Sequence, residues 1–265
     1  MTSIREIIRQ HGLTQSPAHN KKLGQNFLCD VSCLAPHIPD LSAHHVWEVG
    51  PGPGGLTRLL LSKNPQVFTA TEFDQQCVEA LLPLNQTPRV NILQGNALKT
   101  KPQDVFEDPH ASIVIAGNLP YNIGTALLMN WLQDLERIHS IYIMLQKEVV
   151  DRLVAVPRTK AYGRLSVVTQ LCCEVQTLVD LPPEWFTPQP KVFSSFVKLT
   201  PKATRPGLLE LKVIEKLTQD LFSKRRKMLR QTLPEDILQK VEGVQGDQRP
   251  EELPPLTFWK LSAFL

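Results

Sequence analysis

The chain has 265 residues, of which 42% are hydrophobic and 21% are charged, and its formal net charge is +3. This composition is typical of a globular protein with a substantial core and excludes a disordered chain. No uncharged apolar run approaches the ~20 residues that cross a bilayer, and the N-terminal MTSIREIIRQHGL mixes charges into its apolar residues, so we expect a cytoplasmic protein without a membrane span.

Helices and strands alternate through the first part of the chain. IREIIRQHGL predicts a short helix that ends at Gly12, and the segment after KKLGQNFL predicts a helix that breaks near Pro36 and Pro39. Strands are expected at HVWEV, QVFTATEFD, RVNILQGNA and SIVIAGNLPY, with helices at LTRLLLS and CVEALLPL. Strands that alternate with helices predict an α/β fold with a mostly parallel sheet, whose ligands bind at the carboxyl ends of the strands.

The pattern changes in the second part of the chain. TALLMNWLQDL predicts a helix, SIYIMLQKEVVDRL a strand that runs into a helix, and VVTQLCCEVQTLVDL and SSFVKLTP two further strands. Beyond Pro201 only helices are expected, at LLELKVIEKLTQDLF, at SKRRKMLRQTL and in short pieces near the end. We therefore predict a larger domain over residues 1–203, with an N-terminal extension over 1–22, and a small helical domain over 204–265.

The stretch EVGPGPGGLT carries glycines at the spacing G-x-G-x-x-G, namely Gly50, Gly52 and Gly55. Glycines between a strand and a helix let the backbone approach a bound ligand closely, since no Cβ intervenes. Glu72 in TEFD follows about twenty residues later, where an acid holds the ribose hydroxyls of an adenosine cofactor. A nicotinamide dinucleotide and S-adenosylmethionine both satisfy this pattern, so the glycine loop leaves the choice between them open.

The stretch NLPY, from Asn118 to Tyr121, follows a buried strand and favours methyl transfer. An exocyclic amine is a poor nucleophile because its lone pair is delocalised into the ring. Two acceptors, the Asn118 side-chain oxygen and a main-chain carbonyl near Leu119, would bind the amine hydrogens and favour a pyramidal nitrogen. Pro120 would fix the turn, and Tyr121 would offer a flat face to a base that has left its stack.

Eight motifs occur in one order: KKLGQNFL, EVGPGPGGLT, TEFD, NLPYNIG, MLQKEVVDRL, YGRLSV, FTPQPKV and FSKRRKMLRQTL. Together they resemble the KsgA-type ribosomal small-subunit RNA adenine dimethyltransferases, from about Lys21 to the C-terminus. The resemblance implies a Rossmann-like methyltransferase domain followed by a small helical domain that binds RNA. It implies an enzyme that places two methyl groups on the N6 of each of two adjacent adenines, in a hairpin near the 3′ end of 16S rRNA, during ribosome biogenesis.

The resemblance also assigns roles to residues of this sequence. Contacts with S-adenosylmethionine are implied for Asn26, Leu28, Gly50, Gly52, Glu72, Asn96 and Asn118. The implied catalytic residues are Asn118, Leu119, Pro120, Tyr121 and Phe186. Within the second set, Tyr121 and Phe186 would hold the flipped adenine between their rings.

Three positions depart from the family pattern. Asn96 stands where the family usually has an aspartate that accepts from the adenine amine of the cofactor. Asparagine keeps one carbonyl acceptor, so we expect the cofactor to bind, but more weakly. Phe193 stands where the family has aspartate, which alters the packing behind the substrate pocket, and Gly124 replaces a serine with little expected effect.

A basic run, SKRRKMLR, predicts an RNA-binding surface in the helical domain. Its contacts would go to phosphates and would position the RNA without reading its bases. The predicted RNA-binding residues are Lys21, Lys22, Lys191, Lys224, Arg225, Arg226, Lys227 and Arg230. Arg158, Lys160 and Arg164 would extend this surface.

Three competing interpretations stay open at this point. The first is a methyltransferase that acts on large-subunit rRNA, against which FTPQPKV and the RRK run argue. The second is an RNA-binding assembly factor with little or no catalysis, and the third is the nicotinamide enzyme. The five cysteines and seven histidines show no metal-site spacing, so no metal is expected. The expected partner of a monomeric chain is 16S rRNA within the 30S subunit or its precursor.

Overall fold

A computed structural model describes residues 3–15 and 24–265 of the chain. It divides into two compact units, which are described separately. The first contains the described residues of Met1–Lys147 together with Thr177–Leu199, and the second contains Glu148–Gln176 and Thr200–Leu265. The division into domains between residues 203 and 204 rests on the change of pattern in the sequence, and it stays a prediction.

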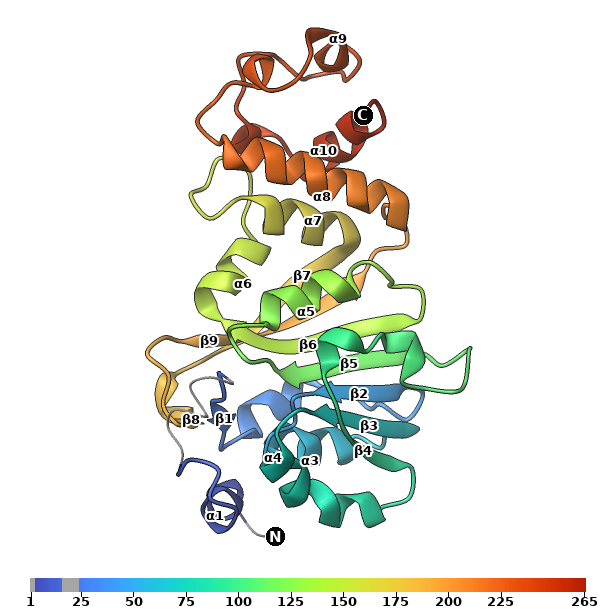
Figure 1. Cartoon of the computed structure of the whole chain (residues 1–265), viewed down its shortest axis with the longest axis vertical. Coiled ribbons are helices and arrows are strands. Elements are labelled where there is room, and N and C mark those ends of the chain that lie inside the picture. The colour runs from blue at the N-terminus through green and yellow to red at the C-terminus, as the bar shows by residue number, and fades with distance from the viewer. Residues whose placement is uncertain (1–2, 16–23) are drawn as a thin grey trace. The chain divides into compact units, whose positions relative to one another are not determined.

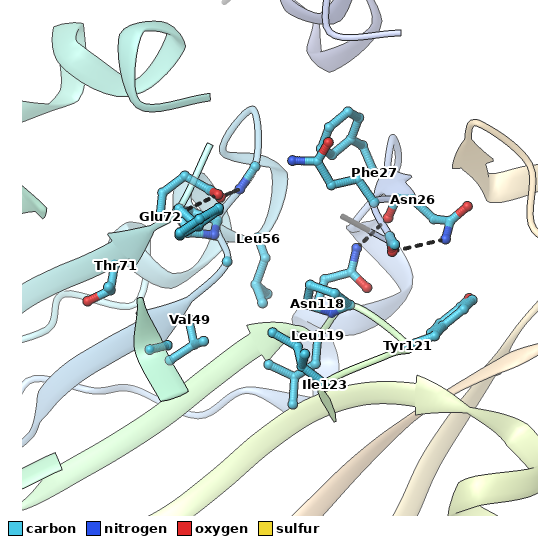
Figure 2. Close-up of a pocket in the computed structure, with 18 of the residues that line it drawn as sticks. Asn26, Phe27, Val49, Leu56, Thr71, Glu72, Asn118, Leu119, Tyr121 and Ile123 are labelled. Atoms are coloured by element: carbon cyan, nitrogen blue, oxygen red, sulfur yellow. Dashed lines mark hydrogen bonds between the residues drawn. The ribbon is translucent and has the colours of Figure 1, made fainter. Parts of the chain in front are cut away.

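A seven-stranded sheet organises the first unit (Figure 1). Five neighbouring strands are parallel, and β9 then pairs antiparallel with β6. In spatial order the strands are β4 (Val90–Gln94), β3 (Val67–Glu72), β2 (His45–Val49), β5 (Ile113–Asn118), β6 (Ile138–Gln146), β9 (Ser194–Pro201) and β7 (Cys173–Leu181). The predicted α/β class with a mostly parallel sheet is therefore confirmed. The carboxyl ends of β2, β3 and β5 meet at one edge, beside the cavity of Figure 2.

Short elements connect and cover these strands. The helices of the first unit are α1 (Ile4–Gln10), α3 (Gly55–Leu61), α4 (Gln75–Leu81) and α5 (Gly124–Trp131), and 3-10 turns lie at Ser32–His37, Leu82–Gln86, Ala97–Lys99, Pro102–Asp104 and Pro183–Trp185. The segment predicted to form a helix before Pro36 is thus a 3-10 turn, in which Pro36 cannot donate a helical hydrogen bond. Two-residue strands β1 (Phe27–Leu28) and β8 (Phe186–Thr187) pair antiparallel.

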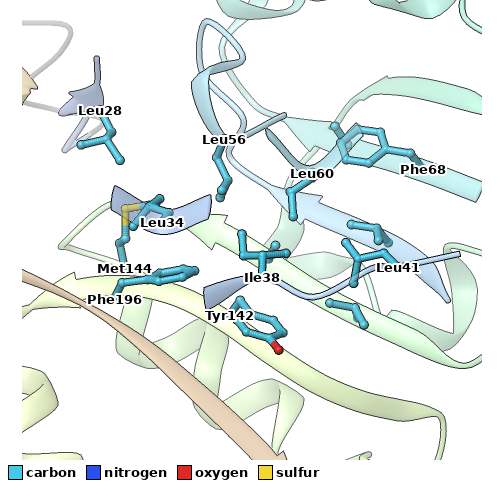
Figure 3. Packing of buried hydrophobic residues seen from close by; sticks show 14 of the residues in the cluster. Leu28, Leu34, Ile38, Leu41, Leu56, Leu60, Phe68, Tyr142, Met144 and Phe196 are labelled. Atoms are coloured by element: carbon cyan, nitrogen blue, oxygen red, sulfur yellow. The ribbon is translucent and has the colours of Figure 1, made fainter. Parts of the chain in front are cut away.

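The core of the first unit lies against the central strands (Figure 3). Every residue of β2 is buried, as expected for a parallel strand that is covered on both faces. Phe68 from β3 and Tyr142 and Phe196 from β6 and β9 belong to the same cluster. Leu34 and Ile38, from the 3-10 turn and the residue after it, pack against this cluster as well.

The second unit is mainly helical. Its elements are most of α6 (Lys147–Leu153), α7 (Arg164–Cys172), α8 (Leu208–Ser223), α9 (Glu235–Leu238), α10 (Pro255–Ser262) and 3-10 turns at Leu229–Gln231 and Pro250–Glu252. Helices α7, α8 and α10 pack together. Phe222 of α8 stacks on Phe258 of α10 at 5.7 Å between ring centroids, and Tyr162 meets Phe222 edge-on. Aromatic packing therefore joins three sequence segments of this unit.

Two predictions of secondary structure are wrong at least in part. The run VVTQLC forms the second half of α7, and the strand predicted over VVTQLCCEVQTLVDL begins only at Cys173, the first residue of β7. Ser166 accepts a hydrogen bond from the Gly163 N–H at the start of the helix, and the apolar side chains of the helix are mostly buried. A short apolar run does not distinguish a buried helix from a strand. Likewise, the RRK run is not helical, since α8 ends at Ser223 and turns follow until Met228.

Candidate functional site

A cavity of about 230 Å³ lies at the carboxyl ends of the parallel strands (Figure 2). Its walls come from the glycine loop after β2, the end of β3, the loop after β4 and the NLPY turn after β5. The segment Gly24–Leu28 supplies a further wall. The site predicted from four separate motifs is thus one place in the fold, as expected from the carboxyl ends of parallel strands.

The glycine loop needs its glycines for backbone shape and for packing. Gly50, Gly52 and Gly54 have φ angles of 66°, 56° and 86°, which side chains rarely allow. A Cβ on Gly52 would lie 2.8 Å from the Phe27 ring, and one on Gly55 would lie 2.8 Å from the Leu28 carbonyl. The glycines therefore admit the N-terminal segment close to the loop, and this packing role was not part of the sequence prediction.

Glu72, the last residue of β3, connects this strand to the glycine loop. Its Oε2 accepts from the Gly52 N–H at 3.0 Å, and its Oε1 accepts from Phe73 and Asp74 N–H groups at 2.7 and 2.8 Å. Burial raises the pKa of Glu72, and the three N–H donors partly offset that rise. Because a carboxylate offers about four acceptor positions, one position remains on Oε2 for a ligand hydroxyl.

The side chain of Asn118 has a defined orientation. Its Nδ2 donates to the main-chain carbonyl of Asn26 at 2.7 Å, as Figure 2 shows. One N–H of the amide is therefore engaged within the protein, and Oδ1 is left as an acceptor at the cavity. Asn26 and Asn118 were both predicted as site residues, and the structure brings them into direct contact.

Tyr121 lines the cavity, whereas Phe186 does not. The Tyr121 hydroxyl shares a 2.6 Å hydrogen bond with Ser194 Oγ at the start of β9, and burial raises the pKa of Tyr121. Phe186 is only 3% exposed and belongs to the hydrophobic core, because β8 pairs it with Leu28. In the structure its ring has a packing role, and the predicted contact of Phe186 with a flipped base stays a prediction.

A family model described as Ribosomal RNA adenine dimethylase matches residues 17–265. The chain belongs to this family. The ribosomal RNA small subunit methyltransferase A of Paramagnetospirillum magneticum is 39% identical, over 99% of this chain and 94% of that protein. The protein of the same name from Brucella abortus is 42% identical, over 94% of this chain and 92% of its own length.

Two solved structures resemble the fold of this rRNA adenine dimethylase. A dimethyladenosine transferase from Plasmodium falciparum has a TM-score of 0.70 at 23% identity, covering 86% of this chain and 91% of that one. The 23S rRNA methyltransferase ErmE has a TM-score of 0.65 at 24% identity, covering 90% and 98%. At such identities the likeness shows the fold alone. The family itself confirms the predicted adenine dimethyltransferase and its cofactor, S-adenosylmethionine, and excludes the nicotinamide alternative.

The cavity of the dimethylase fits that cofactor. The remaining acceptor position of Glu72 suits a ribose hydroxyl, and the glycine loop forms one wall without side chains in the way. Asn26, Leu28, Gly50, Gly52 and Asn96 also line the cavity. Asn96 Oδ1, however, accepts from the Leu98 N–H at 3.0 Å and so caps the turn after β4. A single side-chain oxygen must therefore serve both the turn and any ligand amine.

Gln25 and Phe73, which line the cavity, and Glu48 beside the glycine loop are among the residues that the sequence prediction missed. Gln25 donates to Asp74 Oδ2 at 2.9 Å and so links the N-terminal segment to the end of β3. Phe73 is 62% exposed at the cavity wall, and its position directly after the acid was the available signal. Glu48 is the third, and an acid inside the apolar strand HVWEV was the signal.

Glu48 lies fully buried beside the glycine loop. Its Oε2 accepts from Thr57 Oγ1 at 2.6 Å, while Oε1 has no hydrogen-bond partner among the described residues. Burial raises the pKa of Glu48 to about 8, and the nearby Glu72 carboxylate adds to the rise. Glu48 is therefore mostly neutral near pH 7.

The predicted RNA-binding residues have different surroundings. Lys21 and Lys22 lie outside the described residues. Lys191 in the first unit and Lys224, Arg226, Lys227 and Arg230 in the second are exposed. Arg225 is half-buried, and each of its three guanidinium nitrogens donates to a protein acceptor.

The two remaining family departures affect packing. Phe193 is half exposed, and its main-chain carbonyl accepts from the Lys147 N–H at 2.9 Å, so the chain path before β9 is kept. A Cβ on Gly124 would lie 2.7 Å from the Leu145 side chain, so a serine there would force that side chain to shift.

No cluster of three metal-binding side chains occurs within residues 3–15 and 24–265. None of the helices in these ranges combines the length and the apolar character that crossing a bilayer requires.

Proposed function

We propose that this chain transfers methyl groups from S-adenosylmethionine to the N6 atoms of two adjacent adenines in the hairpin near the 3′ end of 16S rRNA. The substrate would be the 30S subunit or its precursor, which gives the enzyme a role in ribosome biogenesis. Support comes from relatives named for the small ribosomal subunit, which align over nearly the full chain. We further propose a cytoplasmic monomer whose RNA contacts extend into residues 204–265.

One observation carries the chemical part of the proposal: Asn118 donates through Nδ2 to Asn26 and keeps Oδ1 as an acceptor. S-adenosylmethionine supplies an electrophilic methyl group on a sulfonium, and its positive charge drives the displacement. Asn118 Oδ1 would accept one hydrogen of the adenine amine, and a main-chain carbonyl near Leu119 would accept the other. This arrangement favours a pyramidal nitrogen, whose lone pair is less delocalised into the ring and can attack the methyl group.

The proposed reaction needs no strong base from the protein. Among the described residues that line the cavity, only Glu72 and Tyr121 titrate, and Glu72 is bound by three N–H groups. Positioning therefore supplies most of the rate increase, and the proton of the methylated nitrogen leaves to water. In the second transfer the amine has one hydrogen left, so a single acceptor is enough.

The base would be held by the ring of Tyr121. Its hydroxyl is fixed by Ser194, which sets the plane of the ring at the cavity wall. Stacking of a base on an aromatic ring stabilises it by ~1–3 kcal/mol, which offsets part of the cost of taking the adenine out of its stack. For the cofactor, we propose contacts from Asn26, Leu28, Gly50, Gly52, Glu72 and Asn96.

Labelled methyl transfer to 30S particles that lack these methyl groups tests the proposal. We expect incorporation as N6,N6-dimethyladenine at two neighbouring adenines of 16S rRNA. Particles that are bound without incorporation would support an assembly factor instead. Label found in 23S rRNA would support the large-subunit alternative.

A further inference from the structure

All three nitrogens of the Arg225 guanidinium donate hydrogen bonds to acceptors of the protein itself. Nε forms an ion pair with Glu251, Nη1 donates to the Lys160 carbonyl at 3.0 Å, and Nη2 donates to the Thr159 carbonyl at 3.1 Å. These residues all belong to the second unit. The arginine therefore joins the turn after α8 to the loop between α6 and α7.

Glu251 is the centre of this arrangement. Its side chain binds Arg225, and its main-chain carbonyl accepts from the Arg158 N–H at 2.7 Å. Arg158 has a φ angle of 70°, a conformation that residues other than glycine adopt rarely, and this hydrogen bond helps to hold it. The Arg158 guanidinium also pairs with Glu252 at 3.1 Å. We call the contacts of Arg225 with Glu251, Lys160 and Thr159 the Arg225 clasp.

Positive charges outnumber negative charges around the Arg225 clasp. Glu251 and Glu252 compensate Arg225 and Arg158. In the part of the chain that the structure describes, no carboxylate pairs with the exposed cations of the two joined segments. These cations are Lys160, Lys224, Arg226 and Lys227.

We infer that Arg225 is a positioning residue for rRNA and not itself a phosphate ligand. The Arg225 clasp holds the segment with Lys160 next to the turn with Lys224, Arg226 and Lys227, so that a phosphate backbone meets one prearranged basic surface. Four uncompensated cations on two polar segments fit a polyanion, and phosphates contribute most of the sequence-independent affinity for nucleic acids. Prearrangement lowers the entropy that binding must offset. This inference rests on the proposed function and adds to it a residue that holds the segment with Lys160 beside the basic turn.

Two substitutions give opposite outcomes for the two roles of Arg225. Glu251→Gln removes a negative charge, so it would leave RNA affinity unchanged or increase it if Arg225 bound phosphate directly. If the clasp positions the surface, the same change weakens binding to undermethylated 30S particles by about tenfold. Arg225→Lys keeps the charge but loses the planar fork that reaches two carbonyls and a carboxylate together, so we expect a similar loss.

Arg226→Ala serves as the matched control for a direct contact. It should lower the slope of log affinity against log salt by about 0.7–0.9, the value for one lost phosphate contact. Arg225→Lys and Glu251→Gln should leave this slope closer to wild type, and their defect should appear in KM for 30S particles and not in kcat. Melting temperature and cofactor affinity of each variant show that the fold is kept.

The outcomes separate the two proposals. Wild-type affinity in both Arg225→Lys and Glu251→Gln would overturn the clasp and leave the methyltransferase proposal intact. Should Glu251→Gln lower the melting temperature, Arg225→Lys alone decides, because it keeps size and charge. A wild-type protein that neither bound nor methylated 30S particles would instead refute the proposed function.

Discussion

Glu72→Gln tests how one carboxylate organises the cofactor site. In the structure its two oxygens accept three main-chain N–H groups, from Gly52, Phe73 and Asp74. Glutamine has one oxygen and one amino group in their place. If the oxygen keeps Phe73 and Asp74, the amino group faces the Gly52 N–H, donor against donor. The reverse orientation leaves two N–H groups without an acceptor.

The magnitude follows from the smaller of these losses. One buried N–H without a partner lowers the free energy of unfolding by about 1–3 kcal/mol. The bound cofactor separately loses the hydrogen bond from its ribose hydroxyl to a charged acceptor, which contributes about 1.5–3 kcal/mol. Each 1.4 kcal/mol corresponds to about a tenfold change in affinity. We therefore expect cofactor affinity to fall between about tenfold and a hundredfold, and the melting temperature to fall by about 5 °C.

Titration calorimetry with S-adenosylhomocysteine and thermal unfolding would measure the two effects. Glu79→Gln is the matched control, because Glu79 is exposed on α4 and its hydrogen bond comes from the Gln75 side chain. The control should change neither quantity. If Glu72→Gln bound the ligand within twofold of wild type and melted at the same temperature, the role given to Glu72 would be refuted.

Further predictions concern three other residues of the site. Asn96→Asp supplies a second oxygen, so that one oxygen keeps the hydrogen bond from the Leu98 N–H while the other offers a charged acceptor to the cavity. Cofactor affinity measured by calorimetry should therefore rise about tenfold. A decrease in affinity would contradict this reasoning. Glu48 has a pKa raised from 4.5 to about 8, so its stabilising contribution is complete below pH 4.5 and is lost as pH rises through 8. The melting temperature of Glu48→Gln relative to wild type should therefore increase from pH 5 to 9, whereas a difference independent of pH would argue against a neutral Glu48. Tyr121→Phe keeps the ring and loses only the hydrogen bond to Ser194, so its kcat/KM should stay within about tenfold of wild type. In Tyr121→Ala, kcat/KM should be lower still, by an amount that corresponds to the ~1–3 kcal/mol of lost stacking. Equal losses in the two variants would mean that the hydroxyl, and not the ring, matters.

The parts of the site that sequence could predict are those fixed by strand ends. Gly50, Glu72 and Asn118 each follow or end a strongly apolar strand, and parallel strands bring their carboxyl ends together. Their relative positions therefore follow from the α/β pattern before any contact is known. The orientation of the Asn118 amide does not, because it depends on the carbonyl of Asn26, far away in the sequence.

Tertiary contacts without a local signal determine the features that the sequence could not predict. Phe186 is an aromatic residue of the kind that stacks on bases, but in the structure it pairs with Leu28 and its ring is buried in the core. Arg225 belongs to a run of cations, yet Glu251 and two carbonyls determine what it contacts. The apolar run VVTQLC is compatible with a strand and with a helix, and packing against the other helices of the second unit decides for the helix.

The central claim is that the Asn118 turn binds the adenine amine that accepts the methyl group. The most direct test compares labelled methyl incorporation into undermethylated 30S particles by wild type and Asn118→Ala, with cofactor affinity measured on the same preparations. Asn118→Ala removes one of the two proposed acceptors, Oδ1, together with the hydrogen bond to the Asn26 carbonyl that orients it. We expect turnover to fall by about a hundredfold or more, since misplacement of reacting groups by about 1 Å can cost that much. We predict that Asn118→Ala keeps cofactor affinity within about tenfold and loses most turnover. Turnover near the wild-type rate would contradict the account.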